Sequence, residues 1–195
     1  MAQIQYVRAS KNKGRLTVGI SDRNALYTLS VSESSYFSLG EPTPGAEIGT
    51  EELRRLFHED EVFRAMKKAL SILSYADNNR KNLYIKLVRA GFSRDVSSDT
   101  VKECVRLGYV NEQKQLTRIC LREANTALRG PALILRALVA KGYSAEDIKR
   151  ALFDLCRSGE IDFSDNFKKL CEKKGASLPA EISRLRYQYG FENGY

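Results

Sequence analysis

Leu87-Val88-Arg89-Ala90-Gly91-Phe92 is repeated almost unchanged 51 positions later as Leu138-Val139-Ala140-Lys141-Gly142-Tyr143. The same offset relates Arg106–Tyr109 to Arg157–Glu160, and a looser copy follows at Tyr189–Phe191. Two landmarks that share one offset indicate an internal repeat. A period near 50 residues is typical of a supersecondary unit that is used again, each copy burying its apolar face on its neighbour.

The spacing of apolar residues predicts that each repeat contains three helices. Gly91 and Gly142 fall where a helix ends in a left-handed residue, a conformation that glycine adopts most easily. A third repeat would begin near Ser164, and its third helix is missing. The expected helices cover residues 61–76, 79–90 and 96–107, then 111–128, 131–141 and 145–158, then 164–174 and 179–189.

The first 45 residues follow a different pattern. Apolar residues alternate at period two in the runs around Ile4 and Val18, which predicts half-buried strands with a third at Ala25–Ser30. Ser21–Asn24 reads as a turn, and Ser32–Leu39 as a short helix. Gly40–Gly45 holds two prolines and two glycines and predicts a turn or linker.

We therefore predict a mostly α protein: tandem three-helix repeats in a curved, elongated array, preceded by a small antiparallel β region. The expected domains are residues 1–45 (β-rich), 50–110 (repeat 1 with a lead-in helix that bends at His58–Asp60), 111–163 (repeat 2) and 164–195 (partial repeat 3).

Composition narrows the function. No run of about 18 apolar residues predicts a membrane span, and the first residues lack a signal-peptide pattern, so a cytoplasmic location is expected. The four cysteines form no Cys-x-x-Cys pair and His58 is the sole histidine, which disfavours zinc. We expect buried structural thiols, no metal and no cofactor.

The basic excess belongs to the helical part. Residues 1–60 hold 7 Lys and Arg against 8 Asp and Glu, whereas residues 61–195 hold 25 against 16. This imbalance favours a polyanion or an acidic protein surface as partner. Arg118, Arg122, Asn125 and Arg129 would share one face of a helix. The candidate contact residues are Arg64, Lys68, Arg80, Lys81, Lys86, Arg89, Arg118, Arg122, Arg129, Arg136 and Lys141.

Catalytic signatures are missing from the sequence. No Gly-rich phosphate loop occurs, and His58 has no partner that the sequence identifies. The pairs Asp95/Asp99 and Asp162/Asp165 are explained by charges at helix starts. We predict a protein that is not an enzyme and has no catalytic residues.

Several stretches resemble the RecX family of bacterial recombination regulators. They are Ala69–Tyr75, Leu83–Phe92, Val101–Glu112, Arg129–Tyr143 and Ile148–Leu152, in this order over about 130 residues. The strand-rich N-terminal region is similar to that of some members.

The resemblance implies stacked three-helix units and a regulator, usually negative, of the RecA recombinase in recombination, repair and the SOS response. Such proteins lie in the groove of the RecA filament on single-stranded DNA and limit ATP hydrolysis, strand exchange and filament growth. The implied partners are the RecA filament and single-stranded DNA, with double-stranded DNA bound more weakly, and neither a membrane nor a small-molecule substrate.

Two other readings stay open. One is a stand-alone helical-repeat regulator that binds nucleic acid, and the other is an enzyme with an unrecognised site. A sequence reader would lose discrimination at one base position when Arg122 or Arg129 is replaced by alanine, whereas a filament-binding protein would weaken uniformly across sequences.

Overall fold

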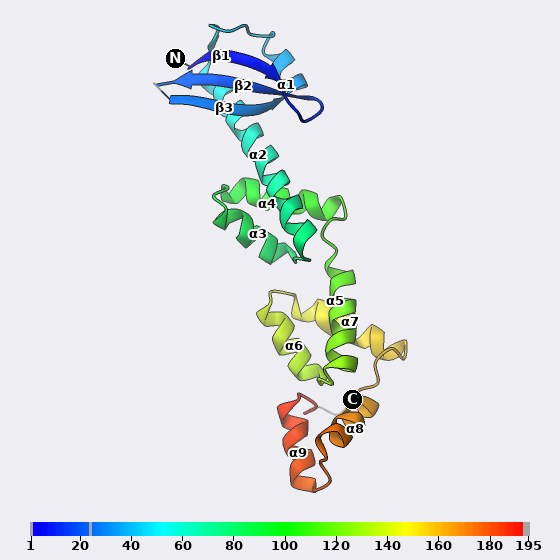
Figure 1. The fold of residues 1–195 in the computed structure, drawn as a ribbon. Coiled ribbons are helices and arrows are strands. Elements are labelled where there is room, and N and C mark those ends of the chain that lie inside the picture. The colour runs from blue at the N-terminus through cyan, green and yellow to red at the C-terminus, as the bar shows by residue number, and fades with distance from the viewer. Residues whose placement is uncertain (1, 24, 193–195) are drawn as a thin grey trace. The chain divides into compact units, whose positions relative to one another are not determined.

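The computed structural model of the chain, drawn in Figure 1, describes residues 2–23 and 25–192. A small antiparallel sheet at the N-terminus is followed by helices, which confirms the predicted fold class. Asn24, expected in a turn, and residues 193–195 at the end of the expected third repeat lie outside the described residues.

The three predicted strands are confirmed, and a short fourth strand was not predicted. They form one sheet in the order β3-β2-β1-β4, in which β1 pairs antiparallel with both β2 and β4. The strands are β1 Ala2–Ala9, β2 Arg15–Asp22, β3 Ala25–Ser32 and β4 Glu47–Ile48. β4 was missed because two residues carry no period.

Alternation of side chains places the apolar residues of the strands on one face of the sheet. Ile4, Val18, Ile20 and Val31 are almost completely buried there, together with Leu56 of the following long helix. The short helix α1 (Glu33–Ser38) begins where predicted, because the Ser32 hydroxyl accepts a hydrogen bond from the Ser35 backbone N–H at 3.2 Å.

Helix α2 (Thr50–Tyr75) is continuous, so the expected bend at His58–Asp60 is wrong. Glu59 and Asp60 instead bind the edge of the sheet from within the helix. Asp60 accepts the backbone N–H of Ser30 at 2.8 Å, and Glu59 accepts that of Ser32 at 2.6 Å. These bonds satisfy edge groups of β3 that would otherwise be free to pair with another strand.

The repeated hexapeptide forms the same helix end twice. α3 (Arg80–Arg89) and α6 (Pro131–Ala140) are followed by Gly91 and Gly142, with φ values of 94° and 93°. The backbone N–H of Phe92 donates to the carbonyl of Leu87 at 3.3 Å, and that of Tyr143 to Leu138 at 3.1 Å. This bond, from the second residue after the helix back into its last turn, is the Schellman pattern.

The other expected helices are present with small shifts of their ends. They are α4 (Arg94–Arg106), α5 (Glu112–Leu121), α7 (Ala145–Arg157), α8 (Phe163–Lys174) and α9 (Pro179–Gln188). The helix expected over 111–128 is divided, since α5 passes into a π-helix, η1 (Arg122–Thr126), after which Leu128 has a φ of 51°.

The segment after α9 returns to the start of α6. The backbone N–H of Gly130 donates to the carbonyl of Tyr189 at 2.7 Å, and that of Ala132 to Gly190 at 3.1 Å. Phe191 is buried in the same core as Phe163. The carbonyl of Gly190 thereby satisfies one of the free N–H groups at the helix start.

Contacts divide the chain into two compact units. One comprises residues 1–74 and 86–103, and the other residues 75–85 and 104–195. The domain boundaries predicted above follow the sequence repeat rather than contacts, and they stay a prediction. Within the described residues, no helix is both long and apolar enough to cross a membrane.

Candidate anion-binding surface

The predicted contact residues are distributed over both units. Most are exposed, but many are engaged by acidic neighbours. Arg64 and Lys68 lie on α2, Arg80, Lys81, Lys86 and Arg89 on α3, Arg118 on α5, Arg122 on η1, Arg129 in the loop after η1, Arg136 on α6, and Lys141 directly after α6.

Four of these arginines have an acidic partner at the surface or on their own helix. Arg64 Nε lies 2.6 Å from the buried carboxylate of Asp60, Arg80 Nε lies 3.3 Å from Glu112, and Arg136 Nη2 lies 3.3 Å from Glu192. Arg118 pairs with Asp77. Exposed pairs of this kind contribute about 1 kcal/mol or less, so they leave the arginines able to exchange partners.

Arg122, Arg129 and Lys141 surround the carboxylate of Glu123, and we call these four residues the Glu123 cluster. Arg122 Nη2 lies 2.8 Å from Oε1 of Glu123, and Arg129 Nη1 lies 2.5 Å from Oε2. The side chain of Glu123 is only 11% exposed. The buried carboxylate thus holds two guanidinium groups at the surface with a surplus of positive charge.

The charges of the cluster act on the titration of Glu123. Burial alone would raise the pKa of its carboxyl group. The hydrogen bond from Arg122 and the charges of Arg129, Arg122 and Lys141 outweigh burial and lower that pKa. Glu123 therefore stays ionised and fixes the two arginines.

The π-helix changes the arrangement that was expected for Arg118, Arg122, Asn125 and Arg129. The wider turn shifts the register after Leu121, and Arg129 lies beyond the helix. The amide of Asn125 donates to the carbonyl of Glu160 at 2.8 Å and accepts from Asn166 at 2.9 Å. The single four-residue face is therefore wrong, and Arg122 and Arg129 meet through Glu123 instead. The sequence carries no simple signal for a π-helix, although such turns occur often at functional sites.

Two lysines near the end of α6 complete the basic surface of this unit. The aliphatic part of Lys81 packs against Gly142, where an added Cβ would lie 2.7 Å from Lys81 Cδ. The carbonyl of Lys141 accepts the amide of Asn79 at 2.8 Å. Among the described residues, neither lysine has an acid within ion-pair distance. Their ammonium groups are free for a ligand.

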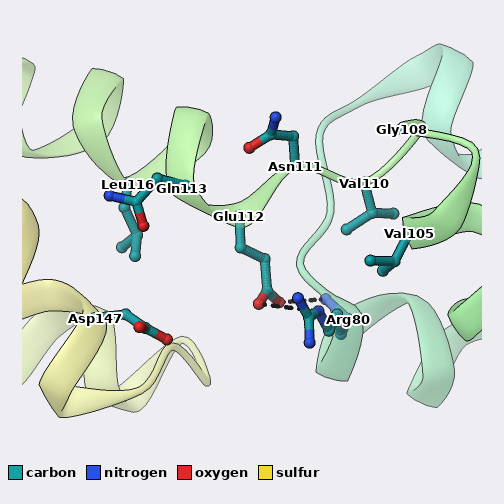
Figure 2. Close-up of a pocket in the computed structure, with 9 residues that line it drawn as sticks. All are labelled: Arg80, Val105, Gly108, Val110, Asn111, Glu112, Gln113, Leu116 and Asp147. Carbon is teal, nitrogen blue, oxygen red and sulfur yellow. Dashed lines mark hydrogen bonds and ion pairs between the residues drawn. The ribbon is translucent and has the colours of Figure 1, made fainter.

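A hollow of about 320 Å³ lies beside Arg80, and Figure 2 shows its lining. The side chain of Glu112 points to Arg80 and also accepts its backbone N–H at 2.7 Å, which caps α3. Asp147 lines the opposite side. With two carboxylates against one guanidinium, this hollow disfavours an anion, and Arg80 serves the helix start.

Sequence reasoning missed the basic residues of α7. Lys149, Arg150 and Arg157 are exposed on this helix, opposite its buried residues. Their spacing of three, four and eight positions was available in the sequence, but the search was confined to stripes on the other helices.

Nothing in the described residues gathers into a metal site, since no group of three or more His, Cys, Asp and Glu side chains could hold an ion there. His58 is exposed on α2. The cysteines Cys104 and Cys120 are buried, and Cys156 and Cys171 are half-buried, all as free thiols.

Comparison with known proteins gives one consistent relationship. The chain is 22% identical over 188 residues to the regulatory protein RecX of Leuconostoc mesenteroides, covering 96% of this chain and 68% of the relative. It is 25% identical over 155 residues to that of Lactobacillus gasseri, covering 80% and 56%, and 27% identical over 144 residues to that of Clostridioides difficile, covering 74% and 66%. No family model matches the chain.

A solved structure supports the fold. The crystal structure of a regulatory protein RecX aligns with a TM-score of 0.73 and 20% identity, over all of this chain and 95% of the other. Fold and charge together define a basic protein of helical repeats with an N-terminal sheet. Since curated RecX proteins match over almost its whole length, the predicted resemblance is confirmed, and this is a RecX-type protein.

Proposed function

We propose that this protein is a non-enzymatic, negative regulator of RecA that binds the RecA filament on single-stranded DNA. In this proposal it acts in the cytoplasm and limits the ATPase, strand exchange and filament growth of RecA. The observation that carries the proposal is the similarity to curated RecX regulatory proteins over 96% of the chain. The residues agree with it, because the basic excess belongs to the helical part.

Surplus positive charge at the Glu123 cluster suits the phosphates of DNA or an acidic filament surface. Arginine guanidinium groups bind phosphate with two hydrogen bonds, and their geometry here is preset by Glu123. Lys81 and Lys141 add charges that are not shared with a carboxylate. We therefore place the main anionic contact of the proposal on this cluster and these two lysines.

The test is the ATPase of RecA from the same bacterium, measured with single-stranded DNA at fixed salt while this protein is titrated in. Inhibition at substoichiometric amounts would support a filament regulator. An unchanged or increased rate would contradict the proposal, and an unchanged rate with tight binding to DNA alone would favour a stand-alone nucleic-acid-binding regulator.

A pair of matched variants tests the surface. Lys81→Gln with Lys141→Gln removes two exposed charges from the proposed contact, and we expect it to require several-fold more protein for the same inhibition. Lys11→Gln with Lys13→Gln removes two charges from the turn after β1, where no basic excess exists. Equal inhibition by both variants would remove these lysines from the contact.

A further inference from the structure

Phe153 lies at the centre of the solvent-facing side of α7. The other side of this helix is strongly apolar, with Ile148, Ala151, Leu152 and Leu155 buried in the core. The phenyl ring itself is 64% exposed. Burying such a ring would contribute about 1.5–3 kcal/mol, so its position among charged residues is not explained by folding.

The surroundings of the ring are basic. Lys149 precedes Phe153 by one helical turn and Arg157 follows it by one turn, while Arg150 lies on the same side. The guanidinium carbon of Arg157 lies 5.9 Å from the ring centroid. At a rise of about 1.5 Å per residue, the flanking cations lie about 6 Å along the helix on either side of the ring.

We propose that this face of α7 binds single-stranded nucleic acid, with one base stacked on Phe153 and the adjacent phosphates held by Lys149, Arg150 and Arg157. The inference rests on the proposed function, which supplies single-stranded DNA as the partner. Exposed aromatic rings in a basic groove are the means by which proteins bind single strands without sequence preference.

The charge and the isolation of the ring favour a nucleic acid over a protein partner. Three cations stand against Asp154 and Glu146 on the exposed side of the helix, and Asp154 lies 3.9 Å from Arg157. Phe153 is the one large apolar residue on that side of α7. A protein interface would place several apolar residues together at its centre.

The first experiment measures binding of a labelled oligo(dT) by fluorescence anisotropy. Stacking on one ring contributes about 1–3 kcal/mol, so Phe153→Ala should raise the dissociation constant about 5-fold to 100-fold or more. Phe153→Trp should bind as tightly as the wild type. Phe37→Ala is the control, because this exposed ring on α1 follows Glu33 by one turn and has no such basic frame. Thermal melting checks that each variant is folded.

An abasic oligonucleotide of equal length separates stacking from charge. It carries the same phosphates without bases, so the wild type should prefer oligo(dT), whereas Phe153→Ala should bind both strands equally. Equal binding of the two strands by the wild type would overturn the proposal.

Direct contact can be seen by fluorescence. The sequence contains no tryptophan, so Phe153→Trp introduces a sole indole. Its emission should be quenched by oligo(dT), while that of Phe37→Trp should not change.

The outcomes for this face and for the proposed function are distinguishable. Unchanged DNA affinity of Phe153→Ala overturns the inference even if the wild type inhibits the RecA ATPase. If that variant binds DNA normally but no longer inhibits RecA, the face contacts protein and the inference is wrong. Loss of DNA binding in the variant supports the inference even where RecA does not respond to the wild type.

Discussion

Glu123 shows how one residue can organise a basic surface. Glutamate next to two arginines in the sequence would usually be read as solvated charge, but here the carboxylate is buried and the guanidinium groups lie over it. Removing the carboxylate would leave two guanidinium groups close together without a counter-charge, which is unfavourable.

We expect Glu123→Gln to lower the free energy of unfolding by about 1–3 kcal/mol at neutral pH. Because the folded protein has a lowered pKa for Glu123, its stabilisation is present above the ordinary glutamate pKa of 4.5 and is lost as the pH falls through the folded value. Urea denaturation of both proteins from pH 7 to pH 3 should therefore show curves that converge at acidic pH.

Asp154→Asn is the control for this experiment. Its side chain is 51% exposed and lies 3.9 Å from Arg157, so the change should cost less than about 1 kcal/mol. A difference between wild type and Glu123→Gln that stays constant down to pH 3 would contradict the assignment.

The cysteines respond to burial rather than to chemistry. Burial, with a smaller contribution from Glu123, raises the pKa of the Cys120 thiol to about 11, and burial also raises the pKa of Cys156. The thiolate is the reactive form, so at pH 8 we expect iodoacetamide to leave Cys120 unmodified in the folded protein. Peptide mass spectrometry would detect the adduct. In urea all four cysteines should react, and modification of native Cys120 at pH 8 within minutes would refute this.

At the scale of elements, the end of α9 is fixed by two glycines that face each other. A Cβ on Gly130 would lie 2.3 Å from the carbonyl oxygen of Gly190, and one on Gly190 would lie 2.4 Å from the backbone nitrogen of Leu133. Neither position can accept a side chain without moving backbone. The contact between the segment after α9 and the start of α6 therefore depends on both residues.

We predict that Gly190→Ala releases this segment and lowers stability by more than Gly175→Ala. Both glycines have positive φ, 79° and 65°, but a Cβ on Gly175 meets nothing within 4 Å. The control thus carries only the backbone strain, about 1–2 kcal/mol. Hydrogen–deuterium exchange should show faster exchange across α8 and α9 in Gly190→Ala. Equal exchange in the two variants would mean that the close approach is unimportant.

At the scale of the whole molecule, positive charge outweighs negative by 8 and the excess lies outside the first 60 residues. Phosphate contacts release counterions, so the logarithm of the DNA-binding constant should fall linearly with the logarithm of the salt concentration. Each contact with a single strand contributes about 0.7 to the slope.

Lys149→Gln with Arg157→Gln should reduce the slope by about 1.4, whereas Lys11→Gln with Lys13→Gln should leave it unchanged. Anisotropy titrations between 50 and 300 mM NaCl would measure both. Equal slopes for the wild type and the α7 variant would show that these side chains do not touch phosphate.

The sequence by itself determined the fold class, the strands and the helix ends, because these depend on local physics. Alternation at period two marks a half-buried strand, and a glycine after an apolar helix marks a left-handed end, as Gly91 and Gly142 show. The sequence also located the basic excess and the resemblance to RecX proteins, which the comparisons confirm.

Only the tertiary structure decided how the charges are arranged. Asp60 continues α2 because it binds Ser30 across 30 positions, Asn125 is bound to Glu160 and Asn166, and Arg122 and Arg129 meet on Glu123. Phe153 looks like a core residue until its exposure is seen. Long-range hydrogen bonds and burial decide these roles, and neither can be read from local spacing, because the energy of a charge or a ring depends on what the rest of the chain places around it.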